Sequence, residues 1–359
     1  MPKKQIHILP FDCGFPLFVP MLPKSKLIKL SKIRISDIWG FWDFLIKNHA
    51  NKHGRKSGNF LPTLLEQAKY FFQAAERAPM KSQPLLYYYS FLNLAKIVVN
   101  IYHPLGKSVE YYHGIETKVN DATTLDTATV TFKQYGGIAS SRISVAKEFL
   151  TILGDSIVVP QPTRIKDMLA SCIGIHRTFS ETYSQKETFF RLMNAQCVER
   201  QGKKITYRTE VRGLTEQLMN DLITAKGYNL TKEGTGDSKK FWYMEELNMV
   251  DYTMSPIRWR MLANQIVSKG IWTYTDGNQY RLYISKDALP MTSASLIYCI
   301  MFFLGSITRY HPYFFESILN AKEQWLISEF LNTQPMQFMF NITSKVVGNY
   351  IFKSRSDSL

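Results

Sequence analysis

The fold is decided by residues 61–99, which read LPTLLEQAKYFFQAAERAPMKSQPLLYYYSFLNLAKIVV. In the first half of this stretch, apolar residues recur at helical spacing, and Pro62 and Pro79 bracket them. Proline is favoured in the first turn of a helix and disrupts later turns, so the pattern predicts a helix from Pro62 to just before Pro79. Pro84 opens a second helix after a short connection, which predicts a packed antiparallel helix pair.

The second helix is predicted over 85–101 and is apolar or aromatic on most sides, as expected of a buried helix. A narrow polar stripe interrupts it, made of Ser90, Asn93, Lys96 and Asn100. An unpaired buried lysine is costly, so Lys96 must reach solvent, pair with an acid, or face a cavity. Two interpretations stay open. The stripe is either a structural network completed by an acid such as Glu66 or Glu76, or part of a site in which Lys96 is catalytic.

A second apolar segment lies near the C-terminus, where residues 288–308 carry no charge. Its densest part, 296–304 (LIYCIMFFL), is too short to cross a bilayer and predicts a buried core helix, with no membrane span. Arg309 and His311 follow at its end. Arg309 either satisfies the last carbonyls and the helix dipole, or presents a guanidinium to phosphate or RNA beside His311.

Between these helical parts the chain is mixed. The stretch TATVTF at 127–132 is strand-like, and 271–285 predicts a β-hairpin turning at Asp276-Gly277-Asn278. We therefore expect a mainly α fold of the α+β type, a helical bundle of N- and C-terminal helices with a small mixed middle region containing the hairpin. The expected regions are 1–125 (basic and helical), 126–290 (mixed), and 291–359, whose helices 291–308, 312–321, 322–332 and 335–350 pack on the N-terminal ones.

The charge is uneven along the chain. The net charge is +15, and residues 1–60 hold eleven Lys and Arg against three Asp, which gives 11 − 3 = +8. A field of this sign attracts polyanions, nucleic acid above all. The predicted nucleic-acid contacts are Lys24, Lys26, Lys29, Lys32, Arg34, Lys52, Arg55 and Lys56.

Several classes of site are not indicated. The four cysteines form no C-x-x-C pair, so neither a zinc cluster nor a disulfide framework is predicted, and a reducing, cytoplasmic compartment is expected. The run at 234–240 lacks the spacing of a phosphate-binding loop. His49 and His53 have H-x-x-x-H spacing but lie in a polar run without the following Glu. No metal and no cofactor are predicted.

The opening stretch is similar to the signature segment of the YaaC-like family of bacterial proteins. Its QA…YF…AA helix followed by PLLYYYSFLNLAK carries the resemblance, with Gly136-Gly137 and GSITRYHP at 305–312 also similar. The positions that match are Gln67, Tyr70, Pro84, Tyr88, Asn93, Lys96 and Arg309. The resemblance implies a bacterial, cytoplasmic protein and no established activity.

Three functions are compatible with these features. The first is a nucleic-acid-associated protein, a component of a bacterial antiphage defence system. The second is a metal-independent ribonuclease with Arg309, His311 and Lys96 as catalytic residues, because the helix pair is similar to HEPN-type domains. Their R-x4–6-H element is absent, since only Tyr310 separates Arg309 from His311. The third is a non-catalytic protein that docks a protein partner. Whether the chain is an enzyme is left open.

Overall fold

The computed structural model describes residues 6–9, 33–53, 60–104, 110–133, 142–155, 162–200, 204–248, 270–276, 279–348 and 351–353. The chain forms two compact units, each assembled from separate stretches of sequence. We call them the helical unit, Ile35–Glu187 with Ser293–Thr343, and the sheet unit, Met1–Arg34 with Thr188–Thr292 and Ser344–Leu359. Each unit is described by itself.

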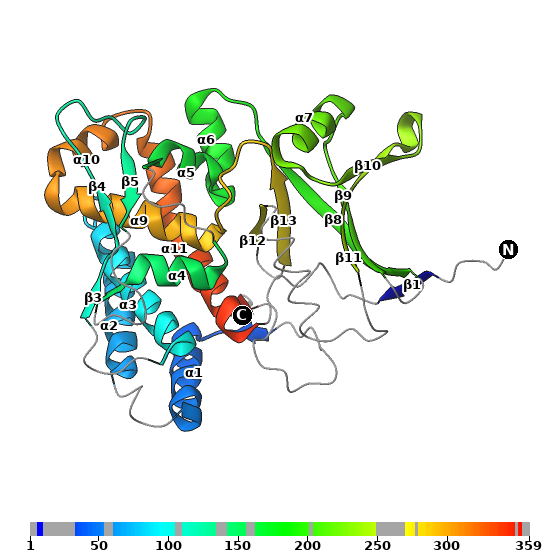
Figure 1. Ribbon diagram of the computed structural model, residues 1–359. Helices are drawn as coiled ribbons and strands as arrows, with labels where there is room; N and C mark the ends of the chain where they lie inside the picture. Colours follow the sequence, from blue (N-terminus) through cyan, green and yellow to red (C-terminus); the bar gives the residue numbers. More distant parts are fainter. Residues whose placement is uncertain are drawn as a thin grey trace, which may run out of the picture. The chain divides into compact units, whose positions relative to one another are not determined.

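Helices from both ends of the chain build the helical unit (Figure 1). They are α1 Ile38–His53, α2 Leu61–Arg77, α3 Gln83–Tyr102, α4 Val145–Leu153, α5 Ile165–Ser171, α6 His176–Tyr183, α9 Ser293–Tyr310, α10 Pro312–Leu319 and α11 Gln324–Val347, with a 3-10 turn at Ile173–Ile175. Asp37 caps α1 by accepting hydrogen bonds from the backbone of Trp39 and Gly40.

The predicted helix pair α2–α3 is confirmed. The apolar stripe of α2 is buried, and the helix ends at Arg77 because Ala78 adopts an extended conformation before Pro79. α3 is the central helix of the unit and packs against α2, α4 and α9. It is buried on most sides for this reason. Its fully buried Phe91 stacks on Phe338 of α11, with ring centroids 4.0 Å apart.

α9 is the apolar helix expected near the C-terminus. It is long and apolar enough to cross a membrane by length and composition, yet 78% of its 18-residue stretch is buried inside the protein. It is therefore a core helix. Gly305 lets it approach α3 closely, since a Cβ atom there would lie 2.9 Å from Cβ of Tyr88 and 3.2 Å from the carbonyl oxygen of Pro84.

Short strands cover one side of the α3–α9 pair. β3 (Glu110–Tyr112) pairs in parallel with β6 (Arg142–Ser144), while β4 (Ile115–Thr117), β5 (Thr129–Phe132) and β7 (Thr163–Arg164) form an antiparallel sheet. His113 and Gly114 make the step from β3 to β4. Gly114 has φ +71°, and a Cβ atom there would collide with the Ser144 side chain. This glycine therefore sets the position of His113.

The sheet unit is dominated by an antiparallel sheet of order β10-β11-β9-β8-β13-β12, with β1 also paired to β8. Its strands are β1 Ile6–Leu9, β8 Phe189–Arg200, β9 Lys204–Val211, β10 Leu230–Glu233, β11 Lys240–Asn248, β12 Ile271–Asp276 and β13 Gln279–Ser285. The unit also contains α7 (Glu216–Lys226), a 3-10 turn at Gly236–Ser238, and the pair of β2 (Ile33–Ile35) with β14 (Ile351–Lys353). The hairpin predicted at 271–285 is confirmed as β12–β13.

The expected helical bundle with a small mixed middle region is wrong, because the protein is an α+β mixture with a seven-stranded sheet. The alternation that marks a strand is obscured in β8, where the register shifts between Met193 and Gln196 and Asn194 adopts φ +53°. β10 lies in a polar stretch that reads as a loop. The separate helices expected at 322–332 and 335–350 are one helix, α11, with Pro335 inside it.

Candidate functional site

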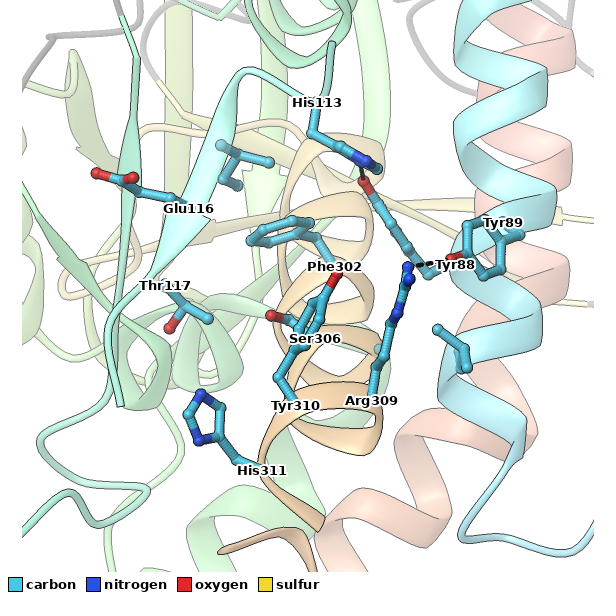
Figure 2. A pocket seen from close by; sticks show the side chains of 13 residues that line it. Tyr88, Tyr89, His113, Glu116, Thr117, Phe302, Ser306, Arg309, Tyr310 and His311 are labelled. Atoms are coloured by element: carbon cyan, nitrogen blue, oxygen red, sulfur yellow. Dashed lines mark hydrogen bonds between the residues drawn. The ribbon is translucent and has the colours of Figure 1, made fainter. Parts of the chain in front are cut away.

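A cavity of about 290 Å³ lies in the helical unit, against α3, α9 and β4 (Figure 2). Its walls are mixed: aromatic rings alternate with a guanidinium, two imidazoles and a carboxylate. It is lined by Leu85, Tyr88, Tyr89, His113, Ile115, Glu116, Thr117, Phe302, Gly305, Ser306, Arg309, Tyr310 and His311. This volume is at the lower end of the range for small-molecule sites, so the cavity suits a small ligand or one unit of a larger ligand.

Arg309 projects along one wall from the last turn of α9. Its Nη1 donates a hydrogen bond to the Tyr89 hydroxyl at 2.8 Å, and its guanidinium carbon lies 4.9 Å from the centre of the Tyr310 ring. Among the described residues, no carboxylate lies within ion-pairing distance of Arg309. A guanidinium has five N–H donors, so several remain for an anion.

The carboxylate in the cavity wall, Glu116 of β4, already has a cationic partner. It forms an ion pair with Lys133 at 2.6 Å. Its negative charge is therefore offset locally, and the Arg309 charge dominates its own side of the cavity.

Tyr88 and His113 form a close polar pair beside Arg309. The Tyr88 hydroxyl is in hydrogen-bond contact with Nδ1 of His113, and the two rings stack with centroids 5.6 Å apart (Figure 2). Tyr88 is buried, and this burial raises its pKa well above the usual value. The phenol therefore stays protonated in the physiological range and holds the imidazole in place.

His113 keeps a solvent-accessible face, although its ring contacts Tyr88. Partial desolvation lowers the pKa of His113, and the positive charges of Lys96 and Arg309 lower it further. The imidazole is therefore neutral at pH 7. A neutral imidazole can accept a proton from a ligand or donate a hydrogen bond to it.

Lys96 lies outside the cavity lining but close enough to affect His113. Its ammonium is 5.7 Å from the centre of the Tyr111 ring, and burial lowers the pKa of Lys96. In the part of the chain that the structure describes, no acid pairs with it. Glu66 instead accepts a hydrogen bond from Tyr70 at 2.9 Å.

The remaining residues of the polar stripe have structural partners. The Ser90 hydroxyl donates to the carbonyl of Ala68 at 2.8 Å, and Asn93 donates to Gln67 at 3.3 Å, so both tie α3 to α2. The Asn100 amide donates to the carbonyl of Lys96 at 2.8 Å and to the Tyr111 hydroxyl at 2.6 Å. These contacts connect α3 to α2 and β3.

The structure brings together only some of the expected catalytic residues. Arg309 and His311 both line the cavity, whereas Lys96 does not. His311 immediately precedes α10 and lies apart from the Tyr88–His113 pair in Figure 2. The histidine beside Arg309 is instead His113, which sequence reasoning passed over. The available signal was weak: a histidine before a glycine, directly after the short aromatic strand β3.

The predicted nucleic-acid contacts fall mostly outside the described residues. This applies to Lys24, Lys26, Lys29, Lys32, Arg55 and Lys56. Lys52 belongs to α1, but its side chain is outside the described part. Arg34 lies in β2 and is exposed.

No group of three His, Cys, Asp or Glu side chains among the described residues is arranged to hold a metal ion. Two cysteines, Cys172 and Cys299, are buried free thiols. Burial raises the pKa of the Cys172 thiol to about 12, which makes it a poor nucleophile at neutral pH.

Comparison with known proteins supports the resemblance noted in the sequence. A family model described as YaaC-like Protein matches residues 32–346, most of the chain, and the chain belongs to this family. No curated protein and no solved structure matches the chain.

Proposed function

We propose that this YaaC-like family member binds nucleic acid and holds one backbone phosphate against Arg309 in the cavity. The observation that carries the proposal is that the Arg309 guanidinium borders the cavity without a carboxylate partner among the described residues. It contacts Tyr89 and Tyr310. Phosphate oxygens match the planar donor fork of arginine.

The overall charge supports a polyanion as the ligand. The net charge of +15 favours association with nucleic acid over an isolated anion, because long-range attraction grows with ligand charge. The eight basic residues predicted from the sequence to contact phosphate, between Lys24 and Lys56, would add to this attraction. Binding of this type releases counterions and weakens steeply with salt.

The proposal is tested by fluorescence anisotropy with a labelled single-stranded oligonucleotide at several salt concentrations. Loss of a charge-assisted contact of about 1.5–3 kcal/mol predicts that Arg309→Gln weakens binding about 10- to 150-fold. The slope of log K against log salt should fall in magnitude by about 0.7, as for one phosphate contact on a single strand.

The matched control is Arg177→Gln. Arg177 is an exposed arginine of the same unit, 3.8 Å from Glu187 and outside the cavity. Its loss removes the same formal charge, so affinity should change less than about twofold because surface charges act weakly at physiological salt. Equal effects of the two substitutions, or no binding by the unmodified protein, would disprove a phosphate site at Arg309.

A second function, metal-independent ribonuclease activity, is favoured by the Tyr88–His113 pair beside Arg309. In the reaction we propose, Nε2 of His113 takes the proton of a ribose 2′-hydroxyl while its oxygen bonds to phosphorus. The bond from phosphorus to the 5′-oxygen breaks, and that oxygen takes a proton from water. The hydroxide left behind takes the proton held on His113, which returns the imidazole to its neutral form. The products are a 2′,3′-cyclic phosphate and a 5′-hydroxyl, and Arg309 stabilises charge on the non-bridging oxygens.

For this role, Nδ1 of His113 must carry the ring proton and donate a hydrogen bond to the Tyr88 oxygen. Nε2 is then unprotonated and can act as the base. Replacing His113 with Gln should lower cleavage about 10²- to 10⁴-fold while leaving affinity within about threefold. An oligonucleotide with a single 2′-deoxyribose at the cleaved position should bind and not be cut. Cleavage of the deoxy substrate, or undiminished cleavage by His113→Gln, would disprove the ribonuclease proposal.

We also propose bacterial antiphage defence as the cellular setting, on the strength of the similarity to HEPN-type domains. Cells producing the unmodified protein should then plate phage less efficiently than cells producing Arg309→Gln. Equal plating across a panel of phages would count against this setting without affecting the binding proposal.

A further inference from the structure

The recess beside Arg309 restricts which nucleic acid could place a base there. The Arg309 side chain is exposed and borders a recess of about 290 Å³. A nucleotide with its phosphate on Arg309 reaches the recess only if its base is free to turn inward. In a duplex the bases are stacked and paired, so a base cannot turn inward without breaking those contacts.

The walls next to Arg309 are suited to a base. Phe302 and Tyr310 project from α9 about two turns apart (Figure 2). Phe302 packs on Tyr88 and His113, with ring centroids 5.3 and 6.4 Å apart, so these three rings form one continuous aromatic wall. Flat aromatic walls beside a cation are the combination that binds unstacked bases and backbone of single strands. Tyr310 is 62% exposed, so a large part of its surface is open to a ligand.

Arg309 orients the Tyr310 ring for this purpose. The guanidinium carbon sits 4.9 Å from the ring centre, a cation–π contact that occupies one face of the ring. The opposite face is left for a stacking partner. The Ser306 hydroxyl, one turn earlier on α9, also lines the cavity and can bond to a base edge (Figure 2).

From this arrangement we infer that the cavity takes a single unpaired nucleotide of a nucleic-acid strand, with its base stacked on Tyr310 and its phosphate on Arg309. The inference rests on the proposed nucleic-acid binding and narrows it to unpaired strands. RNA and DNA share this chemistry, since both have a phosphate and a stacking base, and the test below separates them.

The experiment compares one labelled sequence of twelve nucleotides in four forms: single-stranded RNA, single-stranded DNA, and the blunt RNA and DNA duplexes of the same sequence. Anisotropy titrations at fixed salt should show both single strands binding at least about tenfold more tightly than either duplex. Tighter binding of RNA than of DNA would indicate an additional contact to the 2′-hydroxyl. Equal binding would indicate that only the base and the phosphate are recognised.

Two substitutions of Tyr310 test its stacking role. Tyr310→Leu should weaken single-strand binding about 5- to 150-fold, the range for loss of one stacked base. Its salt slope should be unchanged, because the phosphate contact of Arg309 remains. Tyr310→Phe keeps the ring and should bind within about twofold of the unmodified protein.

The matched control is Tyr313→Leu, which removes a tyrosine that is 90% exposed on α10 and does not line the cavity. It should leave affinity unchanged. Circular dichroism and the melting temperature check that all variants are folded, and Tyr310 is exposed enough for its replacement to be tolerated.

The outcomes separate this inference from the function on which it rests. Duplexes binding as tightly as single strands, with Arg309→Gln weakening both, would uphold phosphate binding and overturn the unpaired nucleotide. Equal affinity of Tyr310→Leu and the unmodified protein would overturn the stacking role. Absence of all binding would overturn both proposals together.

Discussion

The two units differ in how their cores are encoded. The helical unit is built around α3 and α9, two helices that are apolar on most sides and contact each other through Gly305. The sheet unit is built from strands in which buried and partly exposed residues are interleaved, such as β9 and β13. The first type of core depends on a few close-packed apolar surfaces, and the second on many cross-strand pairs. Core substitutions in the two units should therefore lower the free energy of unfolding by different amounts.

The largest effect is expected at Phe91, fully buried in α3 and stacked on Phe338. Phe91→Ala should lower the free energy of unfolding by about 3–5 kcal/mol, because it leaves a cavity between α3 and α11. Denaturant titration followed by tryptophan fluorescence measures the loss. Phe44→Ala is the control, since Phe44 is 56% exposed, and it should cost less than about 1 kcal/mol. Similar losses for both would show that α3 is not the centre of this core.

A smaller effect is expected where α9 meets α3. Gly305→Ala places a methyl group 2.9 Å from Cβ of Tyr88. We expect a net loss of about 1–2 kcal/mol, since overpacking outweighs the gain in helix propensity. Oligonucleotide affinity should fall as well, because the shift would displace Tyr88 in the cavity wall. Thr308→Ala in the same helix serves as control and should be close to neutral. A more stable Gly305→Ala protein would mean that α3 and α9 are less closely packed.

In the sheet unit, Asn194 tests the bulge of β8. Its φ of +53° is in the left-handed region, and its side-chain amide donates to Glu210 at 2.7 Å. Asn194→Ala should cost about 1–2 kcal/mol, because alanine tolerates this conformation poorly. Asn194→Gly should lose less, since glycine adopts it without strain. Thermal denaturation of both variants makes the comparison, and equal losses would assign the cost to the hydrogen bond alone.

The smallest effect concerns the charges around His113. Lys96→Met removes one of the two positive charges that lower the pKa of His113, so this pKa should rise. Histidine NMR chemical shifts followed against pH measure it. Lys47→Met, at an exposed lysine paired with Asp43 in α1, should leave the His113 pKa unchanged. A pKa that does not respond to Lys96→Met would place Lys96 outside the electrostatic environment of the site.

The same lowered pKa has a consequence for stability. In the unfolded chain His113 takes up a proton near its ordinary value of 6.5, whereas the folded protein resists protonation until a lower pH. The unfolded state therefore binds more protons in that interval, and stability falls as the pH drops below about 6.5. His113→Gln should remove this part of the pH dependence.

The chemistry of the site was predicted unevenly. Arg309 was identified from its position after a long uncharged run, and it does line the cavity. Lys96 was identified from the cost of burying an unpaired lysine, and it lies close to the site but outside it. His113 was missed because it belongs to a short connection between two three-residue strands, and such strands carry too few residues to show a period.

The sequence by itself determined the local elements whose signals are contained within a few turns: the α2–α3 pair, the core helix α9 and the β12–β13 hairpin. Only the tertiary structure decided that β8–β11 assemble into one sheet and that Tyr88, His113 and Arg309 share a cavity. Helical periodicity and turn chemistry are local properties of the chain. Strand pairing and the meeting of distant side chains depend on contacts between segments far apart in sequence, which no local pattern records.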